Sequence, residues 1–264
     1  MKASESPYRD IAAVSTGLGS LDRLTGIGGI PMRRITEISG PWSVGKTTLA
    51  LAIVAQAQQT GLRCLWADIE WSFDEKYATA LGVDCDKLDF IQDRFAETAM
   101  DAIEQAMENN EVDVVILDSV GGLLPKAEAE KGAEGKVIGG QAKLVSTFCR
   151  KVVPLLAINN IALVVLNHEF LDIMHGNLKT SGGAKLEYHK SLWLKLRKAN
   201  KRVMQGEKQV GDLIEVEIRK NKMADTLKQK CELTMLYGKG FSAEADLLAE
   251  LMEKGEVTKK GNTF

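Results

Sequence analysis

The stretch that decides the fold reads Ile35-Thr36-Glu37-Ile38-Ser39-Gly40-Pro41-Trp42-Ser43-Val44-Gly45-Lys46-Thr47-Thr48-Leu49-Ala50. It contains a short apolar strand, a loop bounded by glycines and the start of a helix. Gly40 to Thr47 match the pattern G-x-x-x-x-G-K-[ST] at every fixed position. A chance glycine-rich turn could carry the same letters, but the apolar strand before it and the apolar helix after it favour a phosphate-binding loop.

The chemistry of such a loop explains the order of its residues. Glycines let backbone N–H groups surround phosphate oxygens, and the following helix directs its positive end at them. Lys46 can reach the β- and γ-phosphates, and the Thr47 hydroxyl can hold Mg²⁺. The sequence therefore predicts that residues 40–48 bind a nucleoside triphosphate.

Composition narrows the class of protein. The 264 residues, of which 45% are hydrophobic, suffice for one large domain or for one domain with a small appendage. The net charge is only −2, yet residues 185–230 hold 13 Lys or Arg against 6 Asp or Glu. One basic face is compatible with a polyanionic partner, and a solvated surface is the alternative that charge alone leaves open.

Nothing in the sequence indicates secretion or a membrane. Four widely spaced cysteines lack metal-ligand spacing, which favours free thiols in a reducing compartment. The first residues have no apolar core of a signal peptide, and no apolar run reaches the length of a membrane span. We expect a cytoplasmic protein without a membrane partner.

Hydrophobic patterning predicts an α/β fold with a mostly parallel central sheet. Buried strands at residues 35–38, 64–70, 88–91, 112–119 and 161–166 alternate with helices that end near 59, 81, 107 and 159. Period-two patterns near 192–196, 213–218 and 231–235 then predict antiparallel strands that extend one edge of the sheet. A last helix is expected at 243–254. We divide the chain into an entry segment at 1–33, a core at 34–240 and a helical end at 241–264.

Polar residues at the strand ends complete the predicted site. Asp118 closes an apolar strand as a Mg²⁺-binding aspartate would. Glu70, which we place on the strand beside the phosphate-loop strand, could activate a water, or it could only cap the next helix. His168 could sense the γ-phosphate or be merely hydrogen-bonded. Tyr77 and Tyr237 could stack on a base or pack in the core. The carboxyl ends of parallel strands meet at one rim, where ligands bind.

Two loops have a composition that suits nucleic acid. Residues 169–185 include Gly176, Gly182 and Gly183 with Lys179 and Lys185, and residues 128–140 combine glycines with Lys131 and Lys136. A glycine-rich basic loop can follow a phosphate backbone. A lid over the nucleotide or a plain surface loop would have the same composition.

Together these features resemble the RecA recombinase family, on its bacterial and phage side, from about Val14 to Phe264. The resemblance rests on the phosphate loop and on several further segments: residues 15–17, 29–35, 77–84, 112–120, 125–128, 182–183, 220–222 and 237–240. It implies a RecA-like ATPase core that uses ATP and Mg²⁺, binds single-stranded and double-stranded DNA, and assembles with itself as a helical filament.

The resemblance also implies roles for individual residues. Glu70 would be the catalytic glutamate, with Lys46 and His168 beside it, and Lys220 and Lys222 would reach the γ-phosphate of a neighbouring subunit. Asp74, Tyr77 and Tyr237 would lie near the adenine, and Thr47 and Asp118 would hold the metal. DNA contacts would come from Lys136, Ile138, Gly139, Lys143, Arg150, Met174, Gly176, Lys179, Gly182 and Gly183.

Four departures from the family pattern stand out. His168 replaces the usual Gln, as in phage UvsX-type members, which favours a phage origin, and Trp42 replaces a small or acidic residue. The second DNA loop is short, and we expect no N-terminal docking helix and no C-terminal DNA-binding domain.

The functional prediction is an ATP-dependent recombinase that forms filaments on single-stranded DNA, in recombination and repair. A regulator or mediator of the same fold that binds ATP without long filaments is the alternative. A hexameric helicase-type motor is less favoured, because the Lys-Asn-Lys segment and the paired glycines resemble recombinases.

Overall fold

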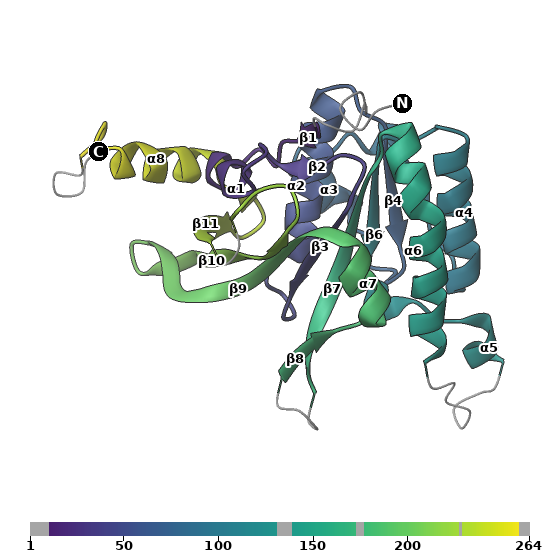
Figure 1. Ribbon diagram of the computed structural model, residues 1–264. Helices are drawn as coiled ribbons and strands as arrows, with labels where there is room; N and C mark the ends of the chain where they lie inside the picture. The colour runs from purple at the N-terminus through teal and green to yellow at the C-terminus, as the bar shows by residue number, and fades with distance from the viewer. Residues whose placement is uncertain (1–10, 131–138, 173–176, 227–228, 259–264) are drawn as a thin grey trace.

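The protein is described by a computed structural model that covers residues 11–130, 139–172, 177–226 and 229–258. Its main feature is one large twisted sheet with helices on both faces (Figure 1). The strands that build the sheet and its appendages are β1 (Ala13–Val14), β2 (Ile30–Pro31), β3 (Ile35–Gly40), β4 (Cys64–Asp68), β5 (Leu88–Ile91), β6 (Val114–Asp118), β7 (Ala162–Asp172), β8 (Asn177–Thr180), β9 (Lys190–Gln205), β10 (Lys208–Asn221), β11 (Lys230–Leu236) and β12 (Gly240–Phe241).

The helices alternate with the parallel strands in the predicted order. They are α1 (Gly19–Leu24), α2 (Lys46–Gln59), α3 (Glu75–Ala80), α4 (Ala96–Glu108), α5 (Lys126–Ala129), α6 (Gly140–Asn159), α7 (Gly183–His189) and α8 (Ala243–Glu253). Short 3₁₀ turns at Cys85–Lys87 and Val120–Gly122 connect them to the strands. The predicted α/β fold is confirmed.

The order of strands across the sheet is β12-β11-β10-β9-β3-β7-β6-β4-β5. Strands β9, β3, β7, β6, β4 and β5 run parallel, whereas β9, β10, β11 and β12 pair antiparallel, so the antiparallel strands extend one edge as predicted. One expectation was wrong: β4, which precedes Glu70, is not beside β3, because β7 and β6 lie between them. Sequence neighbours need not pair when a crossover helix joins them.

Strand β7 is longer than its apolar run predicts. It continues past His168 to Asp172 and pairs antiparallel with β8, so much of the predicted loop at 169–185 is strand and helix. Its polar residues are accommodated by partners: Asn167 donates to Glu37 Oε1 at 3.2 Å, and Glu169 accepts from Lys195 Nζ at 2.9 Å. Hydrogen-bonded polar side chains can thus extend a strand beyond its hydrophobic segment.

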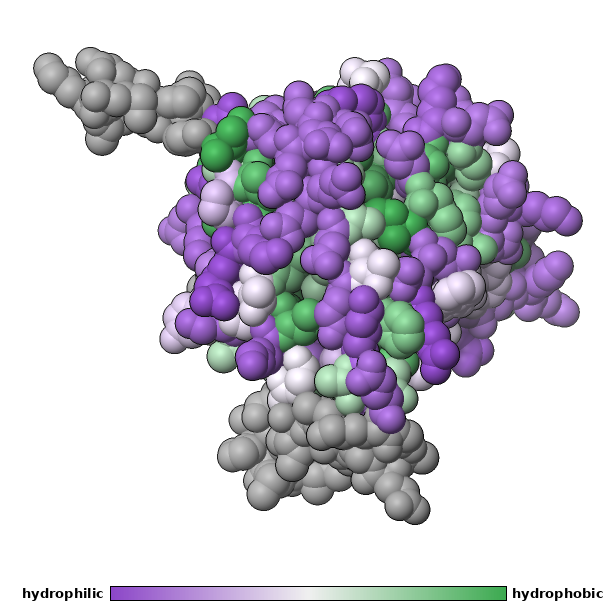
Figure 2. Space-filling model, turned by 90° about the vertical axis from the view of Figure 1, so that its right-hand side faces the viewer, coloured by the Kyte–Doolittle hydropathy of each residue, from purple (hydrophilic) through white to green (hydrophobic). Residues whose placement is uncertain are grey.

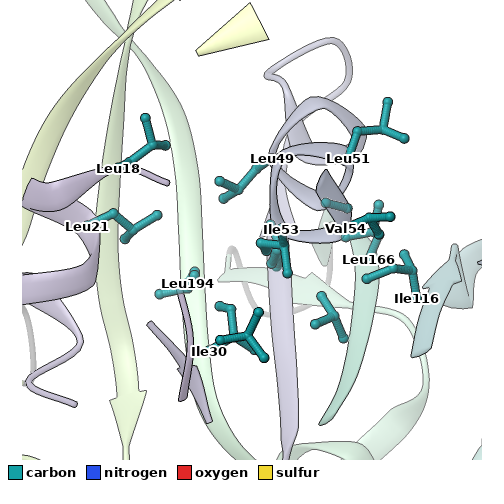
Figure 3. Packing of buried hydrophobic residues seen from close by; sticks show 14 of the residues in the cluster. Leu18, Leu21, Ile30, Leu49, Leu51, Ile53, Val54, Ile116, Leu166 and Leu194 are labelled. Carbon is teal, nitrogen blue, oxygen red and sulfur yellow. The ribbon is translucent and has the colours of Figure 1, made fainter. Parts of the chain in front are cut away.

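Two apolar cores lie on the two faces of the sheet. On one face, Leu49 and Ile53 of α2 share a cluster with Leu166, Ile116 and Leu194 of the strands (Figure 3). On the other, α4, α6 and α7 pack on the sheet through residues such as Ile103, Val152 and Leu186. Burial of apolar surface on both faces explains why the central strands are almost continuously hydrophobic.

Helix α1 and helix α8, from opposite ends of the sequence, pack against each other beside the sheet. Helix α8 extends from the body next to α1 (Figure 1), where Asp246 accepts a hydrogen bond from the Ser20 backbone N–H at 3.0 Å. Arg23 and Glu250 form an ion pair at 2.6 Å. The division at residues 33 and 240 stays a prediction.

The outer surface is mainly polar on the side that carries α4 and α6, where hydrophilic side chains surround small apolar patches (Figure 2). None of the helices in the described ranges combines the length and the apolar character that a membrane span needs.

Candidate active site

The phosphate loop joins β3 to α2 with the backbone geometry that its glycines permit. Gly45 has a φ of 95° immediately before the helix, and a Cβ there would lie 2.7 Å from Met235 Sδ. At Gly40 a Cβ would lie 2.5 Å from the carbonyl oxygen of Leu196. A side chain would collide with its neighbours at either position, and the φ of Gly45 favours glycine. With glycines at both ends, no side chain covers the backbone N–H groups there, and a ligand can reach them.

The Lys46 side chain is buried and folded onto the loop. Its ammonium donates to the carbonyl oxygens of Pro41 at 2.9 Å and Gly40 at 3.2 Å, and it lies 3.2 Å from His168 Nδ1. Burial lowers the pKa of Lys46, while Glu70, Asp118 and Glu169 oppose this shift. Three carboxylates around one ammonium keep its charge where a phosphate would bind.

Asp118 and Thr47 form the candidate metal site. The Thr47 hydroxyl donates to Asp118 Oδ2 at 3.1 Å. Burial, reinforced by the charge of Glu70, raises the pKa of Asp118 to about 7. In the described part of the chain no cluster of three His, Cys, Asp or Glu side chains forms a protein-only metal site. One carboxylate with one hydroxyl nevertheless fits Mg²⁺, which commonly binds few protein oxygens beside substrate phosphates and water.

Glu70 is held by two donors. The Ser119 hydroxyl donates to Glu70 Oε1, and His168 Nε2 lies 2.9 Å from the same oxygen. Because the Lys46 ammonium can only donate, His168 Nδ1 must accept from it, and the His168 proton is on Nε2. The imidazole therefore connects the lysine of the phosphate loop to Glu70. The Glu70 carboxylate is directed into the site and does not act as a helix cap.

A cavity of about 580 Å³ brings the predicted residues together. Its lining includes Lys46, Thr47, Glu70, Asp118 and His168. Trp42 stands at the edge with 78% of its surface exposed, and its ring centroid lies 5.2 Å from that of His168. An indole on the phosphate loop thus covers one side of the imidazole.

The residues expected near a base divide into two groups. Tyr77 and Tyr237 both line the cavity, the first bonded to Thr48 Oγ1 at 3.0 Å and the second accepting from Gln209 Nε2 at 2.8 Å. Asp74 does not line it; its carboxylate caps α3 by accepting from the Tyr77 backbone N–H at 3.0 Å. Tyr77 also packs against the core, whereas Tyr237 is mostly exposed.

The predicted DNA-contacting residues are described only in part. Lys136, Ile138, Met174 and Gly176 lie outside the described residues. Lys143 and Arg150 are exposed on α6 and are seven positions apart, which places them about two turns apart on one side of the helix. Gly139 precedes α6 with a φ of 79°, and Lys179 lies opposite Phe170 in the β7–β8 pair.

Gly182 and Gly183 have a structural reason to be glycine. Their φ values are 93° and 71°, and added Cβ atoms would lie 3.1 Å from Val120 and 3.0 Å from Ala142. They let α7 start against α6. A contact with DNA is not needed to explain them.

Lys220 and Lys222 lie together at the end of α7. Their ammonium groups donate to the backbone oxygens of Glu187 and Tyr188, the second at 3.0 Å. Neither lysine lines the cavity that holds Lys46. Both side chains therefore reach the same turn at the end of α7, and their expected role in a neighbouring subunit stays a prediction.

Sequence reasoning missed Ser119 and the cavity residues next to Tyr237. Ser119 directly follows Asp118, so its place after the acidic strand end was a usable signal. Met235, Leu236 and Gly238 line the cavity because β11 ends beside the phosphate loop, and no local pattern indicates that approach.

Comparison with known proteins identifies the family of the chain. Residues 1–242 match the family described as RecA N-terminal domain. The chain is 40% identical to the RecA protein of Deinococcus radiodurans over 267 aligned residues, which cover all of this chain and 73% of that protein. It is 38% identical to RecA of Thermus aquaticus and 39% identical to RecA of Clostridium novyi, covering 78% and 76% of those proteins. The chain therefore belongs to the RecA family.

Proposed function

We propose that this protein is an ATP-dependent DNA recombinase that binds single-stranded DNA as a filament and hydrolyses ATP at subunit interfaces, in recombination and repair. The observation that carries the proposal is the cavity in which Lys46, the Thr47–Asp118 pair and the Glu70–His168 pair face one another. Membership of the RecA family supports the same reaction class.

The proposed chemistry follows from the hydrogen bonds. Lys46 exchanges the carbonyl oxygens of Gly40 and Pro41 for phosphate oxygens, and the loop N–H groups bind the remaining charge. Glu70, oriented by Ser119 and His168, accepts the proton of an attacking water. Thr47 and Asp118 would hold Mg²⁺, which supplies charge neutralisation at the phosphates when bound. Tyr77 and Tyr237 would contact the base, with Asp74 close by.

The DNA surface in this proposal consists of Lys143 and Arg150 on α6 with Gly139 before it, the glycines at 182–183, and Lys136, Ile138, Met174, Gly176 and Lys179. The exposed cations on one side of α6 support it, because phosphate contacts dominate the affinity of nucleic-acid binding. Cytoplasmic location and a phage source remain predictions.

The decisive experiment measures ATP hydrolysis against protein concentration, with and without single-stranded DNA. We expect turnover that rises cooperatively with concentration and that DNA stimulates, since the active sites would be completed between subunits. The Lys46→Ala variant is the control and should lose activity. ATP binding without stimulated turnover at any concentration would contradict the recombinase and favour a mediator of the same fold.

A second experiment tests the role of the lysine pair in trans. Lys222→Ala should leave ATP binding intact and reduce DNA-stimulated turnover by roughly 10³-fold, the scale of a cationic finger that stabilises transition-state charge. Lys201→Ala, which removes a distant exposed lysine, is the matched control. Mixing Lys222→Ala with Glu70→Gln subunits should restore part of the activity, because one subunit would supply what the other lacks. Full turnover by Lys222→Ala alone would refute the trans role.

A further inference from the structure

A second buried aspartate lies beside the aspartate of the candidate metal site. Asp68 ends β4 and Asp118 ends β6, and the two residues are register partners in the parallel pair of these strands. Asp68 is 1% exposed and does not line the nucleotide cavity. A buried carboxylate needs hydrogen-bond donors, and the identity of those donors indicates its role.

The donors to Asp68 come mainly from the turn that follows Glu70. The backbone N–H of Ser72 donates to Asp68 Oδ1 at 3.1 Å, and that of Phe73 donates to Oδ2 at 3.1 Å. The side-chain amide of Gln92, just after β5, donates to the same Oδ2 at 3.1 Å. Because successive backbone N–H groups converge on one anion, the Asp68 carboxylate determines the path of the chain on the C-terminal side of Glu70.

The backbone on the N-terminal side of Glu70 has a separate anchor. The N–H groups of Ile69 and Glu70 both donate to the carbonyl oxygen of Asp118, at 2.7 Å and 3.3 Å. At Gly122 an added Cβ would lie 3.3 Å from the Ile69 side chain and 3.4 Å from that of Glu70, so this glycine faces the same segment. Glu70 is thus held between two anchors, the Asp118 carbonyl and the Asp68 carboxylate.

Trp71 lies between the two anchors in an unfavourable backbone conformation. Its φ is 56°, in the left-handed region that a bulky residue rarely adopts. Its indole is 60% exposed, so burial of the side chain does little to offset this strain. The hydrogen bonds from the next two residues to Asp68 therefore hold the conformation of Trp71.

We propose that Asp68 is a positioning residue for the carboxylate of Glu70. Asp68 fixes the turn at Trp71, and this turn directs the Glu70 side chain toward His168 and the cavity. Without Asp68, the backbone at Trp71 relaxes from the left-handed region, and Glu70 leaves the position from which it would accept a proton from water. The inference rests on the proposed ATP hydrolysis, and it assigns Asp68 to the proton-transfer step and not to nucleotide binding.

Steady-state kinetics at saturating single-stranded DNA separates these two steps. Asp68→Ala should lower kcat by roughly 10²-fold, the cost of a displacement of about 1 Å at a reacting group, and should change the KM for ATP by less than about 3-fold. Asp68→Asn keeps one acceptor oxygen and should lower kcat by about 10-fold, so it serves as the test where Asp68→Ala does not fold. Turnover at the original rate in Asp68→Asn would overturn the inference.

Asp22→Asn is the matched control. Asp22 also accepts three hydrogen bonds, from the Ser15 hydroxyl and from the N–H and hydroxyl of Thr16, and it does not line the cavity. The same substitution there should leave kcat within about 2-fold of the original value, because no catalytic group follows the turn that Asp22 holds. An equal fall of kcat in Asp22→Asn and Asp68→Asn would contradict a specific role of Asp68.

A rescue variant distinguishes positioning from a general loss of stability. Trp71→Gly added to Asp68→Asn should raise kcat at least ~3-fold, since glycine adopts the left-handed conformation without help from the carboxylate. A general loss of stability predicts a further fall, because a glycine increases the freedom of the unfolded chain. Absence of rescue, or loss of ATP binding in Asp68→Asn, would overturn the positioning role.

Amide hydrogen exchange without nucleotide keeps this inference distinguishable from the proposed function. In Asp68→Asn the peptide that contains residues 69–73 should exchange at least ~10-fold faster, whereas Asp22→Asn should leave its exchange unchanged. A protein that does not hydrolyse ATP would contradict the proposed function, and the exchange rates would still test the anchor at Asp68. Unchanged exchange in Asp68→Asn would overturn the inference whatever the rate of turnover.

Discussion

His168 of β7 joins two groups from other elements, Lys46 at the start of α2 and Glu70 just after β4. Its Nδ1 accepts from Lys46 and its Nε2–H donates to Glu70, so the imidazole orients a lysine and a carboxylate at once. A glutamine side chain could also do both, with its carbonyl toward Lys46 and its amide toward Glu70. A side chain that lacks either the acceptor or the donor could not orient both Lys46 and Glu70.

This argument predicts the effects of two substitutions. His168→Gln should keep ATP turnover within about 3-fold of the original protein, whereas His168→Ala should lower kcat by roughly 10²-fold, the scale of a lost orienting group in acid–base catalysis. Steady-state kinetics at saturating ATP measures both. Equal losses in the two variants would mean that the hydrogen bonds of His168 do not orient Glu70.

Asp118 carries a stability cost that depends on pH. Its pKa in the folded protein is raised to about 7, so the folded state holds more protons than the unfolded state between about pH 4 and pH 7. The free energy of unfolding therefore falls as pH rises through this window. Asp118→Asn should raise it by roughly 1–3 kcal/mol at pH 8 and change it little below pH 4.

Asp113→Asn is the matched control, and its expected effect on the free energy of unfolding has the opposite sign. The Arg63 guanidinium, 2.9 Å away, lowers the pKa of Asp113. Its stabilisation is present above the unfolded pKa near 4 and is lost as pH falls through the folded value. Urea unfolding at pH 8 should thus show Asp113→Asn less stable and Asp118→Asn more stable. The same sign for both would contradict the burial of Asp118 as the cause.

At the scale of elements, a buried ion pair fixes β9 against β3. Lys190 Nζ lies 2.7 Å from Glu37 Oε2, and both of these side chains are fully buried. The same ammonium lies 3.3 Å from the centroid of the Trp193 ring. Asn167 of β7 donates to the other oxygen of Glu37. Three neighbouring strands therefore meet at one carboxylate, whose pKa burial raises despite the attraction of Lys190.

Removing one partner of the Lys190–Glu37 ion pair should lower the free energy of unfolding. Lys190→Met leaves the Glu37 carboxylate buried without its closest cation and should lower the free energy of unfolding by about 3–5 kcal/mol. The double variant Glu37→Met with Lys190→Met should recover most of this loss, because no uncompensated charge remains. Lys201→Met, in an exposed pair with Glu232, should change stability by less than about 0.5 kcal/mol. Urea unfolding measures the stability of all three variants. A Lys190→Met variant as stable as the original protein would refute the idea that Lys190 compensates the buried charge of Glu37.

At the scale of the whole molecule, α8 and α1 connect distant parts of the chain. Asp246 is 4% exposed and accepts hydrogen bonds from both the backbone N–H and the hydroxyl of Ser20. Asp246→Ala removes these acceptors and should lower the free energy of unfolding by about 1–3 kcal/mol in a single transition. Glu253→Ala on the same helix is the control. An unchanged core transition with separate loss of α8 would support the predicted boundary at residue 240.

Much of the candidate site was predictable because its parts are local. The phosphate loop, the aspartate after an apolar strand and the glutamate after another are each encoded in a few consecutive residues. Parallel strands then bring their carboxyl ends to one rim, which is why Lys46, Glu70, Asp118 and His168 were expected together. Ser119, the short strand β8 and the extension of β7 were missed, since hydrogen bonds to remote residues determine them.

The sequence by itself determined the alternation of strands and helices, the loop with the G-x-x-x-x-G-K-T pattern and the residues that could carry the chemistry, because these depend on period and spacing along the chain. Only the tertiary structure decided the order β3-β7-β6-β4, the extension of β7 into its pair with β8, and the meeting of Glu37, Asn167 and Lys190 from three strands. Those features arise from contacts between segments far apart in the sequence, for which no local pattern carries a signal.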